Sequence, residues 1–358
     1  MTPAAADPGA LVDALRDAPG GAERLAALLP EGHPVHAGRS AAETGRLRGY
    51  LLAAFAETGL PAAALPYVLE SLESSDSPDE IAGAALALRG PAGDVPAEVD
   101  ADVAAEVDAA LARAVGALAG ADRTVSFEGY RPAWPYTRPT TALTEVARTI
   151  ARCGGPAARE ALAALDRLPV PEREAGPAAP ACCGHPPAEP APATGPGAGV
   201  LLEDQDGYEV AFAEYFSGKP AVLAFFYTRC DNPYKCSRTV STLAHLQDLL
   251  VARGRDARVR IAAISYDPEF DRPARLRAYG RDRGVRFGPD VRFFRAVAGF
   301  ADLRRRLDLG VGYGASTVNR HRIEVYVLDA RGVVAAAFTR RQWRPEPVLA
   351  AVEGLLER

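Results

Sequence analysis

The sequence has no run of about 18 consecutive apolar residues, the length that a membrane-spanning helix needs, so we expect no membrane span. It also lacks the start of a secretory signal. Asp7, Asp13 and Asp17 occupy the region where a signal peptide needs a basic start and an unbroken apolar stretch. We therefore expect a cytoplasmic protein.

Lysine is scarce. It occurs at Lys219 and Lys235 alone, and arginine supplies the rest of the positive charge. The formal net charge of −5 gives no electrostatic attraction for nucleic acid or an anionic membrane, so neither is an expected partner. A Gly-rich phosphate loop, a paired-carboxylate site and a Ser–His–Asp set are also lacking, so the sequence does not indicate the enzyme classes that depend on them.

The five cysteines would leave one unpaired if all the others formed disulfides, which argues against a secreted disulfide framework. In a reducing compartment, clustered thiols indicate metal binding or redox chemistry. The cysteines are Cys153, Cys182, Cys183, Cys230 and Cys236.

The length of 358 residues favours two domains over one core. Residues 1–170 carry helical periods separated by Gly and Pro, and the unit 64–90 resembles one HEAT-type repeat of two short helices. We predict an N-terminal all-α, HEAT-like helical domain. The expected helices are Leu11–Leu29, Ala41–Ala56, Ala62–Leu72, Ser77–Leu88, Val99–Leu118, Ala142–Cys153 and Pro156–Leu168.

Two segments of this half have no helical period. Ser126–Thr140 is dense in aromatic residues, Pro and Arg; it is either a loop that packs on neighbouring helices, which base rates favour, or a lid facing the thiols. Residues 171–199 are rich in Pro, Ala and Gly and are predicted to be a linker. Cys182, Cys183 and His185 in this linker are either incidental or a soft-metal relay to the site described below.

From residue 200 the pattern alternates between strand and helix. Strand–helix–strand followed by strand–strand–helix is the thioredoxin order, so residues 200–358 are predicted to form an α/β thioredoxin-like domain. The expected elements are a hairpin over Val200–Ala211, strands Ala221–Tyr227 and Val259–Ser265, helices Ser237–Arg253, Arg272–Gly280 and Phe300–Leu309, a hairpin of Ile323–Leu328 and Val333–Phe338, and helix Glu346–Leu356.

Two cysteines lie where this fold presents thiols. Cys230 ends the first buried strand, and Cys236 follows after five intervening residues, just before a helix whose N-terminal dipole favours a thiolate. Arg229 and Lys235 add positive charge, and His321 stands just before a later strand. Two sulfurs and one imidazole suit a soft or borderline metal such as copper, whereas the same sulfurs could instead form a disulfide.

Several segments of the C-terminal half together match one known family. They are LEDQDGYEV, FFYTRC, ISYDPEFDRPARLRAY, HRIEVYVLDARG and Trp343 before the last helix. On these segments, residues 200–357 resemble the Sco/SenC copper-chaperone family, thioredoxin-fold proteins that help to assemble the copper site of cytochrome c oxidase. That resemblance implies that Cys230 and Cys236 are thiolate ligands of copper and that His321 is the imidazole ligand. Family members space the cysteines by three residues, whereas this chain has five.

Four functions remain open at this stage. The first is a protein that holds copper through Cys230, Cys236 and His321 and delivers it to an acceptor protein or to a partner bound by the helical domain. The second is a metal-free thiol–disulfide oxidoreductase or thiol peroxidase that uses Cys230 and Cys236 catalytically. The third is an interaction module, and the fourth is copper-catalysed oxidation of a bound substrate, so the sequence leaves open whether the protein is an enzyme.

Other candidate residues rank lower. Asp267 follows the second buried strand and could orient a ligand, although Asp-Pro is more often a turn. His33 and His36 are expected in a surface loop without a third ligand, and His245 is expected on the solvent side of its helix.

Overall fold

The computed structural model describes residues 8–90, 101–119, 122–125, 140–165 and 199–357. The predicted linker at 171–199, including Cys182, Cys183 and His185, lies outside the described residues except for Gly199. The same is true of the predicted loop Ser126–Thr140 except for Thr140.

The chain forms two compact units. The helical unit comprises Met1–His185 and, in addition, Gly312–Arg320. The sheet unit comprises Pro186–Val311 and His321–Arg358. The chain therefore leaves the sheet unit once for the helical unit and then returns.

The helical unit is built from helices whose starts carry sequence signals. Ser40 accepts a hydrogen bond from Glu43 N, and the Glu43 carboxylate accepts one from Ser40 N, which together cap the helix that follows. Ser77 caps the helix that begins at Pro78, as expected. The helices are α1 (Pro8–Arg16), α2 (Gly21–Ala26), α3 (Ala41–Thr58), α4 (Leu65–Ser74), α5 (Pro78–Ala87), α6 (Ala101–Leu118), α7 (Ala142–Cys153) and α8 (Pro156–Leu165), with short strands β1 (Thr124–Val125) and β2 (Thr140–Thr141) and the 3₁₀ turns η1 (Pro34–His36) and η2 (Ala62–Ala64).

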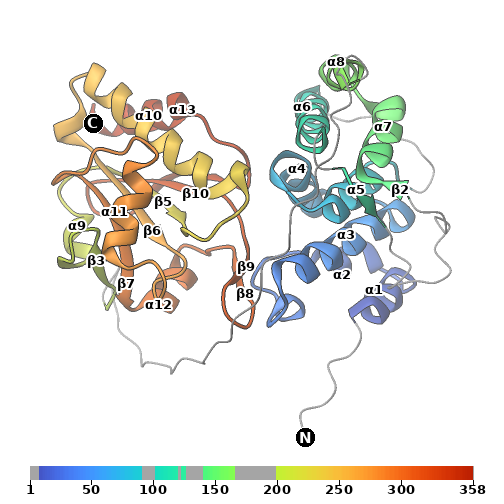
Figure 1. The fold of residues 1–358 in the computed structure, drawn as a ribbon, viewed down its shortest axis with the longest axis horizontal. Coiled ribbons are helices and arrows are strands. Elements are labelled where there is room, and N and C mark those ends of the chain that lie inside the picture. The colour runs from blue at the N-terminus through green and yellow to red at the C-terminus, as the bar shows by residue number, and fades with distance from the viewer. Residues whose placement is uncertain (1–7, 91–100, 120–121, 126–139, 166–198, 358) are drawn as a thin grey trace, which may run out of the picture. The chain divides into compact units, whose positions relative to one another are not determined.

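The prediction of one helix over Leu11–Leu29 is wrong, because α1 and α2 are separate helices. Pro19 cannot donate a helical hydrogen bond, and Gly20 adopts a left-handed φ of 68°. The region is helical, as predicted (Figure 1), but its HEAT-like character stays a prediction.

Helices α3 and α5 approach each other at glycines. A Cβ atom added at Gly83 would lie 2.1 Å from the carbonyl oxygen of Gly49, and one at Gly49 would lie 2.4 Å from the carbonyl oxygen of Asp79. The two backbones are therefore in direct contact, and a larger residue at either glycine would force them apart. Tyr50 and Phe55 of α3 are fully buried.

In the described residues of the sheet unit, seven strands form one sheet in the order β11–β10–β5–β6–β7–β3–β4. Strands β5, β6 and β7 are parallel, and the remaining pairs are antiparallel. All six residues of β5 are buried, which explains its continuous apolar sequence. The strands are β3 (Leu201–Asp204), β4 (Glu209–Ala211), β5 (Ala221–Phe226), β6 (Arg260–Ser265), β7 (Val291–Ala298), β10 (Glu324–Leu328) and β11 (Val334–Thr339).

The connections of the sheet follow the predicted thioredoxin-like order. Helices α10 and α13 pack against each other and on strands β5 and β10, and α11 packs on β7 (Figure 1). The sequence missed β7, where Arg292 and Arg295 interrupt the apolar pattern. The helices are α9 (Phe212–Tyr215), α10 (Arg238–Ala252), α11 (Pro273–Arg281), α12 (Phe300–Arg306) and α13 (Pro345–Leu356), with one 3₁₀ turn, η4 (Asp256–Arg258).

The sequence also missed two strands between α12 and β10. Strands β8 (Val311–Tyr313) and β9 (Val318–His321) pair with each other in a separate two-stranded sheet. Among the helices of the described segments, none is both long enough and apolar enough to cross a membrane.

We expect Gly83→Ala to lower the free energy of unfolding of the helical unit by about 1–3 kcal/mol, because its methyl group would collide with the backbone of α3. Gly116→Ala is the matched control. Gly116 lies on the exposed side of α6 with open space around it, so alanine should leave stability unchanged or raise it by up to about 1 kcal/mol. Urea unfolding followed by circular dichroism measures both, and equal effects of the two variants would contradict the close contact.

Candidate metal centre

Three side chains converge at the carboxyl end of β5. One ligand atom from each of Cys230, Cys236 and His321 lies within 4.8 Å of the others. His321 Nε2 is 3.5 Å from each of the two sulfurs. Cys236 is 1% exposed and His321 is 5% exposed, whereas Cys230 is partly accessible. The structure thus brings together the three residues that the sequence predicted as ligands.

The turn after β5 fixes Cys230. The Asp271 carboxylate accepts hydrogen bonds from the backbone N–H of Thr228, at 3.0 Å, and from the Thr228 and Ser265 hydroxyls. Burial raises the pKa of Asp271, while these hydrogen bonds oppose that shift by favouring the carboxylate. Cys230 N in turn donates to Tyr227 O at 3.4 Å, so the first sulfur projects from a braced turn.

The enlarged spacing between the cysteines is taken up by a wide helical turn. The Asn232 side chain accepts a hydrogen bond from Tyr234 N at 2.8 Å, and Pro233–Ser237 (η3) forms a single π-helical turn that leads into α10. A π turn holds one more residue than an α turn. It therefore absorbs additional chain and returns Cys236 to the neighbourhood of Cys230.

His321 is the last residue of β9, and its ring is oriented by hydrogen bonding. Its Nδ1 lies 3.0 Å from Arg322 O, and a carbonyl oxygen only accepts, so Nδ1 carries the proton. The lone pair of a neutral ring is then on Nε2, the atom that faces both sulfurs. Lys235 Nζ donates to His321 O at 2.6 Å, and the rings of Tyr227 and Tyr266 pack at centroid distances of 5.3 and 5.5 Å.

The two thiols have opposite electrostatic environments. The Cys236 thiol donates a hydrogen bond to the Cys230 sulfur, and this bond is the main cause that lowers the pKa of Cys230 to about 3, against the effect of burial. Complete burial and that same hydrogen bond raise the pKa of Cys236 well above its usual range. These opposite shifts favour the thiolate at Cys230 and the thiol at Cys236.

Three residues that support the candidate ligands were not predicted from the sequence. Lys235 was considered only as nearby charge, whereas it holds the backbone of His321. Asp271 and Tyr266 lie in the segment that resembles the Sco/SenC family, which was the available signal. The Tyr266 hydroxyl donates to the buried Glu324 carboxylate, which fixes the ring beside His321.

Asp267 supports the turn after β5 and does not orient one of the three candidate ligands. Its carboxylate accepts from Arg229 at 2.6 Å, and its carbonyl accepts from Phe270 N at 3.1 Å. Arg229 also stacks over the Phe270 ring, with its guanidinium carbon 4.1 Å from the ring centroid. The pair thus braces the segment beside Cys230.

Three other histidines belong to the described residues, and none of them is part of the cluster of Cys230, Cys236 and His321. His245 is exposed, as predicted, and the partly buried His33 accepts from Val35 N at 3.2 Å. The prediction that His36 lies in a surface loop is wrong. It is 1% exposed, its Nε2 bonds Leu28 O at 2.9 Å, and burial lowers its pKa to about 3.

Comparison with solved structures gives many similar chains. ScoI from Bradyrhizobium japonicum, with copper bound, is 25% identical, with a TM-score of 0.36; the match covers 44% of this chain and 98% of that chain. ScoI from Arabidopsis thaliana, with copper bound, is 20% identical, with a TM-score of 0.37; that match covers 46% and 99%. A SCO1/SenC family lipoprotein from Bacillus anthracis is 20% identical, with a TM-score of 0.39, and its match covers 44% and 93%.

No curated protein matches the chain. A family model described as SCO1/SenC matches residues 200–357, which span the sheet unit, both cysteines and His321. The C-terminal segment of this chain, residues 200–357, belongs to the SCO1/SenC family.

Proposed function

We propose that this protein binds copper through Cys230 Sγ, Cys236 Sγ and His321 Nε2, and holds it for delivery or for copper-dependent redox chemistry. The observation that carries the proposal is the convergence of these three soft or borderline donors within 4.8 Å, with Nε2 left free of its proton by the Nδ1 hydrogen bond. The family of the segment agrees with this donor set.

The protonation states favour stepwise binding. Cys230 already carries negative charge and is the partly accessible donor, so it is the first ligand that an entering ion meets. Cys236 must lose its proton when it becomes a ligand, so binding releases about one proton to solvent. The accessible Cys230 sulfur is also the atom through which an acceptor protein with its own thiolates or imidazoles would exchange the metal.

A metal-free alternative rests on the same two sulfurs. A thiolate at Cys230 beside a thiol at Cys236 is the reduced state of a dithiol pair. The Cys230 sulfur would attack a disulfide substrate and form a mixed disulfide, releasing one substrate thiolate. The Cys236 sulfur, after losing its proton, would then displace the second substrate thiolate and form the Cys230–Cys236 bond.

We expect the wild-type chain to bind one cuprous ion under anaerobic conditions, and Cys230→Ala, Cys236→Ala and His321→Ala each to weaken that binding by more than about 100-fold, or about 2.7 kcal/mol. Competition with a chromophoric chelator measures the affinity. All variants carry Cys182→Ser and Cys183→Ser, so that these thiols cannot contribute. Cys153→Ala, in α7, is the control and should bind as the parent does. A parent that binds no copper but forms a Cys230–Cys236 disulfide would favour the alternative.

We expect alkylation of Cys230 to stay fast as the pH falls from 8 to about 5. Its folded-state pKa lies below its ordinary value of about 8.5, so the thiolate persists throughout this range. Cys236→Ala removes the largest cause of that shift, and the rate at pH 6 should fall by about tenfold or more. Iodoacetamide labelling with peptide-resolved mass spectrometry measures each thiol separately. Cys153, whose pKa is raised by burial, should react slowly in both proteins. Loss of Cys230 reactivity below pH 8 in the parent would contradict the assignment.

A further inference from the structure

One hairpin of the helical unit leads along the chain into His321. Gly312–Arg320 lies inside the SCO1/SenC segment in sequence, but it belongs to the helical unit in space. The next residue is His321, which belongs to the sheet unit and ends the same strand, β9. A metal ligand therefore follows immediately on a segment that is built into the helical unit.

The hairpin is held by its backbone. Gly38 N donates to Tyr313 O at 3.1 Å, and Gly38 forms a parallel bridge with Gly314. The Asn319 amide donates to His36 O and to Arg39 O, at 2.9 Å in each case. These bonds satisfy the backbone carbonyls of the buried His36 and of Arg39.

Close packing adds to these bonds. A Cβ atom at Gly312 would lie 2.3 Å from Glu31 O, so the hairpin backbone touches the helical unit without an intervening side chain. The hairpin is thus fixed in position along most of its length and is not a loose excursion of the chain.

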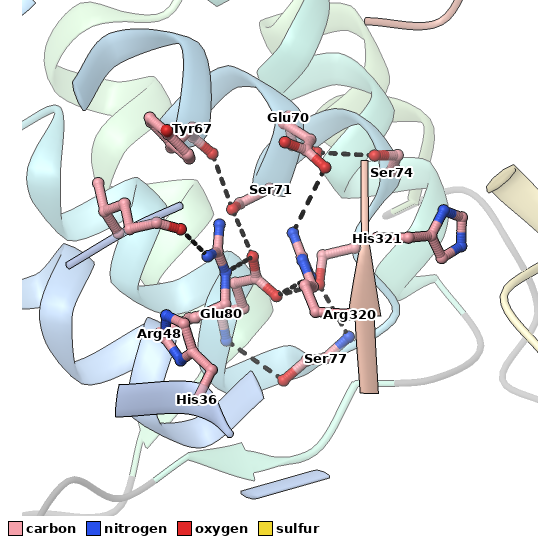
Figure 2. A network of polar contacts seen from close by, with 12 residues as sticks. His36, Arg48, Tyr67, Glu70, Ser71, Ser74, Ser77, Glu80, Arg320 and His321 are labelled. Atoms are coloured by element: carbon pink, nitrogen blue, oxygen red, sulfur yellow. Dashed lines mark hydrogen bonds and ion pairs between the residues drawn. The ribbon is translucent and has the colours of Figure 1, made fainter. Parts of the chain in front are cut away.

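Arg320 supplies the strongest anchor. Its guanidinium donates to Glu80 at 2.6 Å and lies 3.6 Å from a Glu70 carboxylate oxygen, and both carboxylates are fully buried (Figure 2). Glu80 is itself fixed by Arg48 at 3.3 Å and by the Ser71 hydroxyl at 2.7 Å. Removing the Arg320 cation would leave buried negative charge with less compensation, which is costly in a low-dielectric interior.

Arg320 and His321 are neighbours on one strand and point to opposite sides of it. Figure 2 shows the Arg320 side chain entering the carboxylate network while the His321 ring extends away from it. The His321 carbonyl is held on the other side by Lys235 of the sheet unit. Arg320 is therefore held by an ion pair within the helical unit, and His321, the next residue, is held by a lysine within the sheet unit.

We propose that Arg320 is a positioning residue for His321, and that the Glu70–Glu80 carboxylate pair of the helical unit thereby sets the geometry of the copper ligand. This inference rests on the proposed function. Its consequence is reciprocal coupling between the units: an intact anchor strengthens copper binding, and bound copper stabilises the anchored hairpin. A partner that disturbed the helical unit near Glu80 would loosen His321 and favour release of the metal.

The test is Arg320→Gln in the full chain, with Arg113→Gln as the matched control. Arg113 also pairs with a buried carboxylate of the helical unit, Glu73, but it lies on α6 and outside the hairpin. We expect Arg320→Gln to weaken cuprous-ion affinity by at least about tenfold, as removal of a ligand's supporting partner does, and Arg113→Gln to leave it unchanged. Arg320→Lys retains the charge and should restore part of the affinity.

A metal-free measurement separates this inference from the proposed function. In ¹⁵N-histidine-labelled protein, assigned with His321→Ala, Arg320→Gln should shift or broaden the ring signals of His321, whereas Arg113→Gln should not. If the parent binds no copper, the proposed function fails and these signals still decide the role of Arg320. Unchanged His321 signals in Arg320→Gln, or equal loss of affinity in Arg113→Gln, would overturn the positioning role. Should Arg320→Gln not fold, the same two measurements on Arg320→Lys decide, and wild-type behaviour of that variant with its shorter side chain overturns the proposal.

Discussion

The candidate metal centre depends on one hydrogen bond, from His321 Nδ1 to the carbonyl of Arg322. It fixes the tautomer of the ring, so that the remaining lone pair lies on the nitrogen 3.5 Å from both sulfurs. A histidine that was free to rotate would not offer this lone pair to a metal ion, because its acceptor nitrogen would have no fixed direction.

The spacing of the cysteines shows how local geometry can preserve a site when sequence spacing changes. Five intervening residues would place the sulfurs apart in a regular α-helical turn, whereas the π turn Pro233–Ser237 and the Asn232 cap fold the longer loop back. The same loop carries Lys235, whose ammonium group holds His321. The longer loop thus contributes both a ligand and the support of another ligand.

Much of this could be predicted from sequence, because it is encoded locally. The apolar run before Cys230 indicated a buried strand, and Ser77 indicated a helix start. The assignment of His321 as the third ligand came from the resemblance of its segment to the Sco/SenC family. The separation of Leu11–Leu29 into two helices could also have been predicted, because Pro19 and Gly20 both disfavour a continuous helix. The hydrogen bond from the Asn319 amide to His36 O could not be predicted, because the two residues are 283 positions apart. Likewise, nothing near Arg320 in sequence indicates that it pairs with Glu80, 240 residues earlier.

The chemistry of the anchor is itself informative. Apolar residues of similar size often hold two segments together at least as well as a buried ion pair, because burying charges requires their desolvation. What an Arg–carboxylate pair adds is direction, since the planar guanidinium fits its partners in few orientations. A fixed orientation matters little where two segments only have to be held together. It matters much at Arg320, because the ring nitrogen of its neighbour His321 must point at two sulfurs. The use of charge at Arg320 therefore agrees better with a positioning role than with cohesion alone.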